Sequence, residues 1–159
     1  MIRSALGHTA GVRSACHHGH PAGQRHGVRR GPPRRRHREG HRRALRLHRA
    51  VEAANQLAKE GIECEVIDLR TLSPIDMETV IESVENTGKL VVVDEANPRC
   101  SIASDISATV AQQAFKDLKA PIEMVTPPHT PVPFSRDLES FYLPSSEKIV
   151  KSVQKTLIN

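Results

Sequence analysis

The chain has 159 residues and a formal net charge of +5, but this average joins two regions of opposite charge. Residues 1–49 hold 13 Arg, no Lys and one acid, whereas residues 50–159 hold 10 basic residues against 17 acids. No run of apolar residues approaches the roughly 18 that a membrane-spanning helix requires. The three cysteines are an odd number and lack the spacing of metal ligands, which is typical of a protein in a reducing compartment. We therefore expect a cytoplasmic protein without a membrane partner.

The basic N-terminal region, residues 1–47, has two functional interpretations. Its arginines can neutralise phosphates, which is typical of a nucleic-acid-binding arm, but no aromatic residue accompanies them to stack on bases. Cys16, His17, His18 and His20 are soft metal ligands, but no second ligand pair completes a zinc site. We expect no metal site here, and a nucleic-acid-binding module is the alternative function.

A third explanation of the same region is a coding segment read in a shifted frame. Arg, His, Gly, Pro and Ala dominate residues 1–47, which is typical of GC-rich sequence read out of frame. Codons for residues 39–44 (EGHRRA), shifted forward by one base, can encode Lys or Arg, Val, Ile or Thr, Val, Val or Ala, and Leu. Such a run is typical of a buried strand. We hypothesise that residues 1–47 are disordered or out of frame and that residues 48–159 form the domain.

After the basic region the apolar pattern becomes regular. A first helix has its apolar positions at Val51, Ala54, Leu57 and Ala58 and ends at Gly61. Residues 62–69 (IECEVIDL) predict a strand. Ser73 as N-cap and Pro74 at the first helical position predict a second helix, which ends at Gly88.

Residues 89–96 (KLVVVDEA) contain the clearest strand, because a short apolar run without alternation is typical of a strand buried on both faces. Ser101 as N-cap predicts a helix over 102–118, and a short strand at 122–125 follows. The proline-rich residues 126–133 predict an extended loop, and a last helix begins near residue 144. This alternation predicts an α/β fold, a three-layer α/β/α sandwich with a mostly parallel sheet.

The chemical signals in the sequence are weak. Asp94 and Glu95 can be an acid/base pair or cation ligands, but adjacent strand residues point to opposite faces, so we expect them to cap the strand end. His129 can act as an acid or base, although a loop histidine with one backbone hydrogen bond is the commoner case. Cys100 precedes a helix and has no partner, so we expect a buried, inert thiol. We predict no catalytic, cofactor-binding or metal residue.

Three stretches resemble, in the same order and spacing, the C-terminal domain of the β subunit of thiamine-diphosphate-dependent 2-oxo acid dehydrogenases. They are GIECEVIDLRTLSPID, TGKLVVVDEANPRCSIASDISA and PHTPVPFS. VVVDEANPRC together with PHTPVPFS is most similar to the acetoin dehydrogenase branch, and the pyruvate dehydrogenases are close. The resemblance runs from about residue 48 to the end and implies a transketolase C-terminal domain.

The resemblance also implies partners and a cofactor. Such a domain serves subunit assembly with an α subunit and a second β subunit, and it helps dock the dihydrolipoyl acyltransferase core. Thiamine diphosphate belongs to the parent enzyme and is not expected to bind this fragment alone, because the preceding β-subunit domain, with its activating glutamate, is absent. We therefore expect the fragment alone to be inactive.

Aromatic residues near the C-terminus indicate where such contacts are made. Phe134, Phe141 and Tyr142 are three of only four aromatic residues, and aromatic side chains are enriched at interface centres. With His129 and Glu147 they form our predicted interface; the alternative is a small core under a long loop. We also expect salt-sensitive docking through the acidic surface and the C-terminal helix that Glu147 begins.

One expected strand has no counterpart in this sequence. In the family, the first parallel strand is expected between the strands at 62–69 and 89–96, and here the Arg/His segment replaces it. We expect this position to be empty or filled by a short strand at 43–47 (RALRL), and we expect no packed core from residues 1–40.

Overall fold

The computed structural model describes residues 2–5, 12–15 and 39–158, with side chains from residue 47 onward. The elements in these ranges are β1 (Ile2–Ala5), β2 (Val12–Ala15), α1 (Glu39–Lys59), β3 (Glu63–Leu69), α2 (Met77–Thr87), β4 (Val91–Val93), α3 (Ile102–Gln113), the 3₁₀ turn η1 (Phe115–Asp117), β5 (Glu123–Val125), α4 (Arg136–Tyr142) and α5 (Ser146–Ile158). None of the helices in these ranges is long and apolar enough to cross a membrane.

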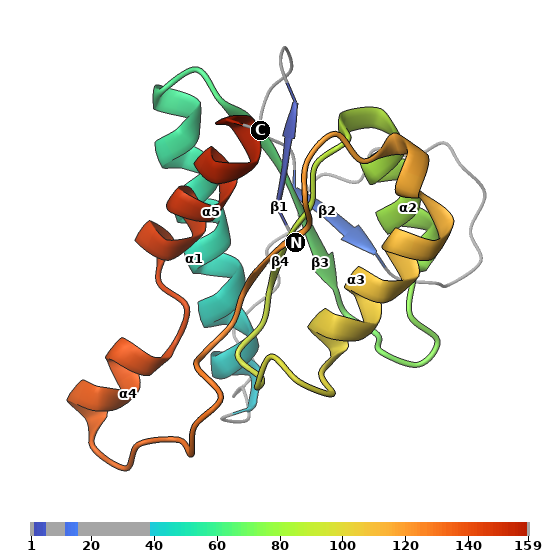
Figure 1. Ribbon diagram of the computed structural model, residues 1–159. Coiled ribbons are helices and arrows are strands. Elements are labelled where there is room, and N and C mark those ends of the chain that lie inside the picture. The colour runs from blue at the N-terminus through green and yellow to red at the C-terminus, as the bar shows by residue number, and fades with distance from the viewer. Residues whose placement is uncertain (1, 6–11, 16–38, 159) are drawn as a thin grey trace, which may run out of the picture.

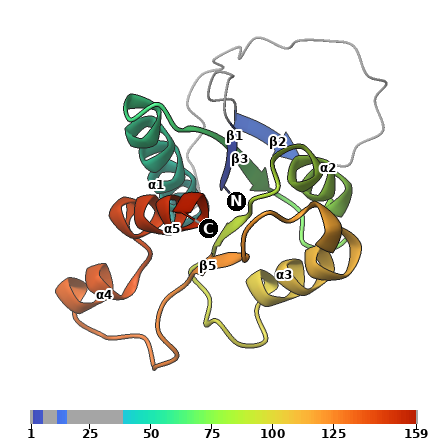
Figure 2. The same cartoon turned by 45° about the horizontal axis from the view of Figure 1, so that its top comes forward.

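The elements form three layers, as the sequence predicted. Helices α1 and α5 cover one face of the sheet, and α2 and α3 cover the other (Figure 1 and Figure 2). Each face has its own core. The core on the α1 and α5 side is built from Ala50, Ala53, Ala54, Leu57, Cys64, Val66, Val91, Val125, Ile149 and Val153. The core on the α2 and α3 side is built from Val80, Val84, Leu90, Val92, Ala103, Ile106, Val110 and Ala114.

Strand β4 contributes to both cores, because successive side chains of a strand point to opposite faces. Val91 joins the core under α1 and α5, and Val92 joins the core under α2 and α3. Both side chains are almost fully buried. The continuous valine run is therefore explained by burial on both faces, which is what the sequence predicted for residues 89–96.

The sheet has the order β2-β3-β1-β4-β5. Strand β2 is parallel to β3, and β4 is parallel to β5. Strand β1 is antiparallel to both of its neighbours, β3 and β4. It follows that the other strands all run in one direction and that β1 alone is reversed, so the sheet is mostly parallel.

Strand β1 lies in the position where the sequence left a strand missing. It pairs with β3 at four positions, from Ile2 opposite Val66 to Ala5 opposite Glu63. Its register with β4 has a single pair, Ile2 opposite Val91. The strands β1 (IRSA) and β2 (VRSA) share the pattern apolar-Arg-Ser-Ala, which strand propensity does not favour, and neither was predicted.

The predicted strand at residues 43–47 is wrong, because these residues belong to α1. The helix begins at Glu39 and continues without a break into the predicted helix. Ala, Leu, Arg and Glu, which dominate this stretch, are among the strongest helix formers. The cluster from Cys16 to His20 and most of the basic region lie outside the described residues, and the division at residues 47 and 48 stays a prediction.

Two helix boundaries differ from the prediction. Helix α2 is capped by Asp76, whose carboxylate accepts a hydrogen bond from Thr79 N at 3.1 Å, and not by Ser73. Leu72 and Ile75 form an isolated β-bridge that delays the start of the helix. Helix α3 is capped by Ser101, as predicted, but it ends at Gln113 and is followed by η1. Helix α4 was not predicted.

Candidate functional site

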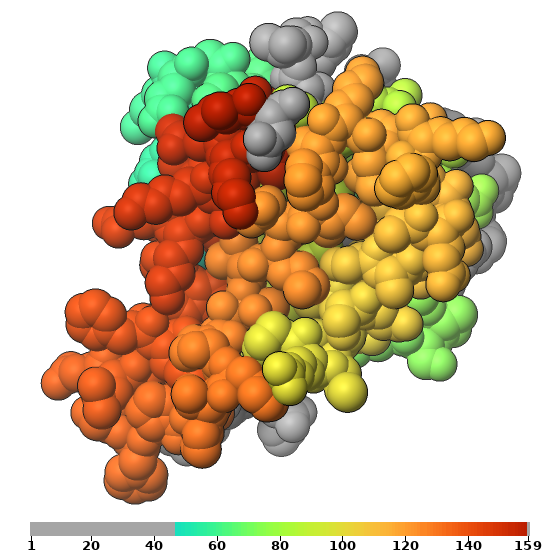
Figure 3. Space-filling model, in the orientation of Figure 1, coloured from blue at the N-terminus to red at the C-terminus, as the bar shows by residue number. Residues whose placement is uncertain are grey.

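The segment between β5 and α5 presents four exposed apolar side chains, which we call the protruding apolar surface. Val132 and Phe134 lie on the loop before α4, and Leu138 and Phe141 lie on α4 itself. Their exposed fractions are 66% (Val132), 106% (Phe134), 58% (Leu138) and 83% (Phe141). Leu138 and Phe141 are three residues apart and therefore lie on one face of the helix. This segment stands away from the three layers (Figure 1 and Figure 3).

The protruding apolar surface is held in place by contacts beneath it. Tyr142 is buried, and its hydroxyl donates a hydrogen bond to Thr130 O at 2.9 Å, which ties α4 to the loop. The Lys148 ammonium donates to Phe141 O at 3.0 Å. The Arg49 guanidinium donates to Pro144 O, linking α1 to the segment between α4 and α5. These hydrogen bonds therefore fix the position of the segment that carries the protruding apolar surface.

The predicted interface residues fall into two groups. Phe134 and Phe141 are exposed on the protruding apolar surface, and His129 is exposed on the same loop. Tyr142 is buried below that surface and supports it, and Glu147 is exposed at the start of α5. The sequence prediction did not include Val132 or Leu138. The spacing of three residues between Leu138 and Phe141 was the available signal for Leu138.

Two different helices expose groups of charged side chains. Helix α5, which begins with exposed Glu147 in its first turn, exposes Lys148, Lys151 and Lys155. The Lys155 ammonium pairs with Glu123 at 2.7 Å. Helix α2 instead exposes a row of acids: Glu78, Glu82 and Glu85. Their spacing of four and three residues places them on one face of α2, which we call the acidic stripe.

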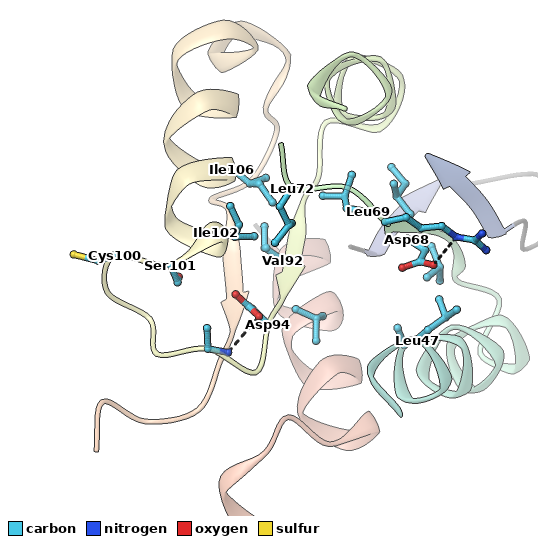
Figure 4. Close-up of a pocket in the computed structure, with 16 residues that line it drawn as sticks. Leu47, Asp68, Leu69, Leu72, Val92, Asp94, Cys100, Ser101, Ile102 and Ile106 are labelled. Atoms are coloured by element: carbon cyan, nitrogen blue, oxygen red, sulfur yellow. Dashed lines mark hydrogen bonds and ion pairs between the residues drawn. The ribbon is translucent and has the colours of Figure 1, made fainter. Parts of the chain in front are cut away.

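A cavity of about 750 Å³ opens at the carboxyl ends of β3 and β4. Its walls come from both helix layers (Figure 4). The lining residues are Leu47 and Ala50 of α1; Val66, Ile67, Asp68 and Leu69 of β3; Arg70 and Leu72 after it; Val92 and Val93 of β4; Asp94, Ala96, Cys100 and Ser101 after it; and Ile102 and Ile106 of α3. Most of these side chains are apolar.

The polar groups of the cavity have partners within the chain. The buried carboxylate of Asp94 accepts a hydrogen bond from Ala96 N at 3.2 Å, so it caps the strand end as predicted. Asp68 and Arg70 form an ion pair of 3.4 Å. The Ser101 hydroxyl accepts from Ser104 N at the start of α3. The Cys100 side chain is exposed and points away from the cavity, so the prediction of a buried thiol is wrong (Figure 4).

Thiamine diphosphate needs groups that this cavity does not supply. A diphosphate and its metal require oxygen ligands for the cation and free positive charge or N–H groups for the phosphates. No group of three or more His, Cys, Asp or Glu side chains gathers in the part of the chain that the structure describes. Among the described lining residues, Arg70 is the one guanidinium, and it is paired with Asp68. These residues do not fit the cofactor.

The layers, the strand directions and the strand-end cavity define a three-layer α/β/α sandwich. The chain belongs to the transketolase C-terminal domain family, which matches residues 45–149. A similar solved structure is a split-gene transketolase, described as an inactive tetramer of β chains. It is 27% identical with a TM-score of 0.60, and the match covers 72% of this chain and 36% of that one.

Curated relatives confirm the resemblance read from the sequence motifs. The β subunit of an acetoin:2,6-dichlorophenolindophenol oxidoreductase from Cupriavidus necator is 70% identical over 113 residues, which cover 71% of this chain and 33% of the relative. The corresponding Bacillus subtilis subunit is 56% identical, covering 65% and 30%. A pyruvate dehydrogenase E1 β subunit from Rickettsia bellii is 42% identical, covering 70% and 34%. The chain thus spans about a third of the length of these relatives.

Proposed function

We propose that this chain is the C-terminal domain of the β subunit of an acetoin or 2-oxo acid dehydrogenase complex. It serves subunit assembly, with an α subunit and a second β subunit as partners, and docking to the dihydrolipoyl acyltransferase core. The identity of 70% to an acetoin oxidoreductase β subunit favours the acetoin branch. The parent enzyme uses thiamine diphosphate in the cytoplasm, and this domain alone is not catalytic.

The observation that carries the assembly role is the protruding apolar surface. Soluble monomers rarely expose several large apolar side chains together, and such patches mark interaction sites. Burying one phenylalanine or leucine side chain stabilises a complex by about 1.5–3 kcal/mol. Phe134 and Phe141 are almost completely exposed in the isolated chain, so each can contribute a binding free energy of this size when a partner covers it.

The test compares two exposed phenylalanines. Phe141→Ser removes an aromatic side chain from the protruding apolar surface, and Phe115→Ser removes one that is 72% exposed on η1, in another part of the molecule. Both variants are mixed with the cognate α subunit, and the mass of the complex is measured by light scattering. We expect Phe141→Ser to weaken association at least tenfold and Phe115→Ser to leave it unchanged. Equal behaviour of the two variants would contradict the proposal.

Docking to the acyltransferase core is assigned to the acidic stripe on α2. Aligned acids on an exposed helix face suit a basic partner surface and give salt-sensitive association. Glu78→Lys with Glu85→Lys is expected to weaken docking at low salt, and Lys151→Glu on α5 is the charge-altering control. Docking that is unchanged by the double substitution, or insensitive to ionic strength, would exclude this surface.

A further inference from the structure

We propose that Lys148 is a positioning residue for assembly. Its ammonium holds the carboxyl end of α4 and so fixes the orientation in which the protruding apolar surface meets a partner subunit. This inference rests on the proposed function, because it concerns the surface formed by Val132, Phe134, Leu138 and Phe141. Lys148 itself belongs to α5 and acts on that surface through α4 (Figure 1).

Helix α4 depends on support from other elements. It has seven residues, and a helix of this length is not stable by itself. Ser135 at its amino end makes no side-chain capping hydrogen bond, and its last turn contains no basic residue to interact with the carboxyl end of the helix dipole. A positive charge that stabilises this end therefore has to come from another part of the chain.

Lys148 and Arg49 supply positive charge at this end. The Lys148 ammonium donates to Phe141 O at 3.0 Å and to Leu143 O at 3.5 Å. The Arg49 guanidinium, from α1, donates to Pro144 O. Carbonyls in the last turn of a helix have no partner within the helix, so a cation there satisfies them and also interacts favourably with the dipole. Cations from two other helices thus converge on the carboxyl end of α4.

The position of Lys148 is unfavourable for its own helix. Helix α5 begins at Ser146, and the Ser145 hydroxyl accepts a hydrogen bond from Lys148 N at 3.3 Å, so Lys148 is the third helical residue after an N-cap. A glutamate at this position would complete a capping box, and a cation in the first turn opposes the helix dipole. Since the charge of Lys148 weakens the start of α5, its favourable contribution is the contact with Phe141 O and Leu143 O.

The test replaces Lys148 by glutamate in the full chain, because this change has opposite expected effects on the two helices. Hydrogen exchange of the Leu143 amide, which donates to Glu139 O at 3.1 Å, reports on α4. Exchange of the Ile149 amide, which donates to Ser145 O at 3.1 Å, reports on the start of α5. We expect Lys148→Glu to make the Leu143 amide exchange about fivefold faster and the Ile149 amide no faster than before. A residue that only stabilised the fold would change both amides in the same direction.

Association with the cognate α subunit is then measured by light scattering. We expect Lys148→Glu to weaken association about fivefold, whereas Lys148→Arg, which keeps the charge, leaves it unchanged. Lys151→Glu is the matched control, because it makes the same change in charge at an exposed position three residues further along α5. This control is expected to associate like the unmodified chain.

Phe141→Ser, measured in the same experiment, separates this inference from the function on which it rests. If Phe141→Ser weakens association and Lys148→Glu does not, the positioning role is wrong and the assembly surface stands. If neither variant weakens association, the assembly role is contradicted and this inference with it. Equal effects of Lys148→Glu and Lys151→Glu, or faster exchange at both the Leu143 and the Ile149 amides, would also overturn the proposal.

Discussion

The chain builds two helix–glycine–strand units that are alike in outline and differ in packing. In the first unit α1 leads through Gly61 to β3, and in the second α2 leads through Gly88 to β4. Both glycines have a positive φ, 80° and 73°. A side chain added at Gly61 would meet open space, whereas one at Gly88 would lie 2.9 Å from Asp117 O. The turn at Gly88 is therefore closely surrounded by other atoms, whereas the turn at Gly61 has open space beside it.

The difference continues into the two strands. Strand β4 pairs with β5 in parallel over all three of its residues, and both of its faces are covered. Strand β3 pairs with β2 over Val66–Leu69 but with β1 only over Glu63–Val66, and its carboxyl end, like that of β4, borders the cavity. We infer that the second unit forms the stable centre of the domain, and that the first unit is open where its strand meets the cavity.

The largest expected effect comes from shortening one leucine in each unit. Leu90 is 1% exposed in the core of the second unit, and Leu69 is partly buried at the cavity in the first. We expect Leu90→Ala to lower the free energy of unfolding by about 2–5 kcal/mol and Leu69→Ala by about 1 kcal/mol, measured by urea denaturation. Equal losses would mean that the end of β3 is packed as closely as β4.

The two glycines give the next largest difference. Gly88→Ala combines a left-handed backbone with a contact of 2.7 Å to the Lys119 side chain, whereas Gly61→Ala has the backbone cost alone. We expect a loss of about 1 kcal/mol for Gly61→Ala and about 2–3 kcal/mol for Gly88→Ala. A thermal melt of both variants measures the difference. A larger loss at Gly61 would reverse the ranking of the two turns.

Cys64 tests whether the amino half of β3 is closed even though its carboxyl end is not. Burial raises the pKa of the Cys64 thiol from 9.0 to about 12. Because the folded pKa is the higher one, the stability linked to the protonated thiol is full below pH 9 and is lost as the pH rises toward 12. We expect the chain to lose about 1 kcal/mol more than Cys64→Ala between pH 8 and pH 10. Cys100→Ala is the control, and the same pH dependence in Cys64→Ala would show that the thiol is not protected.

The sequence predicted the second unit well because its signals are local. The run Val91–Val93 identified a strand buried on both faces, and Ser101 was correctly predicted as a helix cap. The Ser101 side chain pairs reciprocally with Ser104, a contact within one turn of the chain. Interactions of this kind depend on neighbouring residues, so a single sequence contains them.

The N-terminal strands and α4 could not be predicted, since distant contacts determine them. Strand β1 contains Arg and Ser and joins the sheet opposite residues about 60 positions away in the chain. Helix α4 is seven residues long and is held by the bond from Tyr142 to Thr130. The aromatic residues indicated the candidate interface, but only the fold separated exposed Phe141 from buried Tyr142.

Amide hydrogen exchange tests the central claim, that the β4–β5 pair is the stable centre and that β3 opens at the cavity. The amides of Asp94 and Glu123 donate to Val125 O and Leu90 O across this pair, each at 3.1 Å. We predict that both amides exchange only through global unfolding, while the amides of Asp68 and Leu69 exchange much faster through local opening. Equal protection of the two sets of amides would contradict the account.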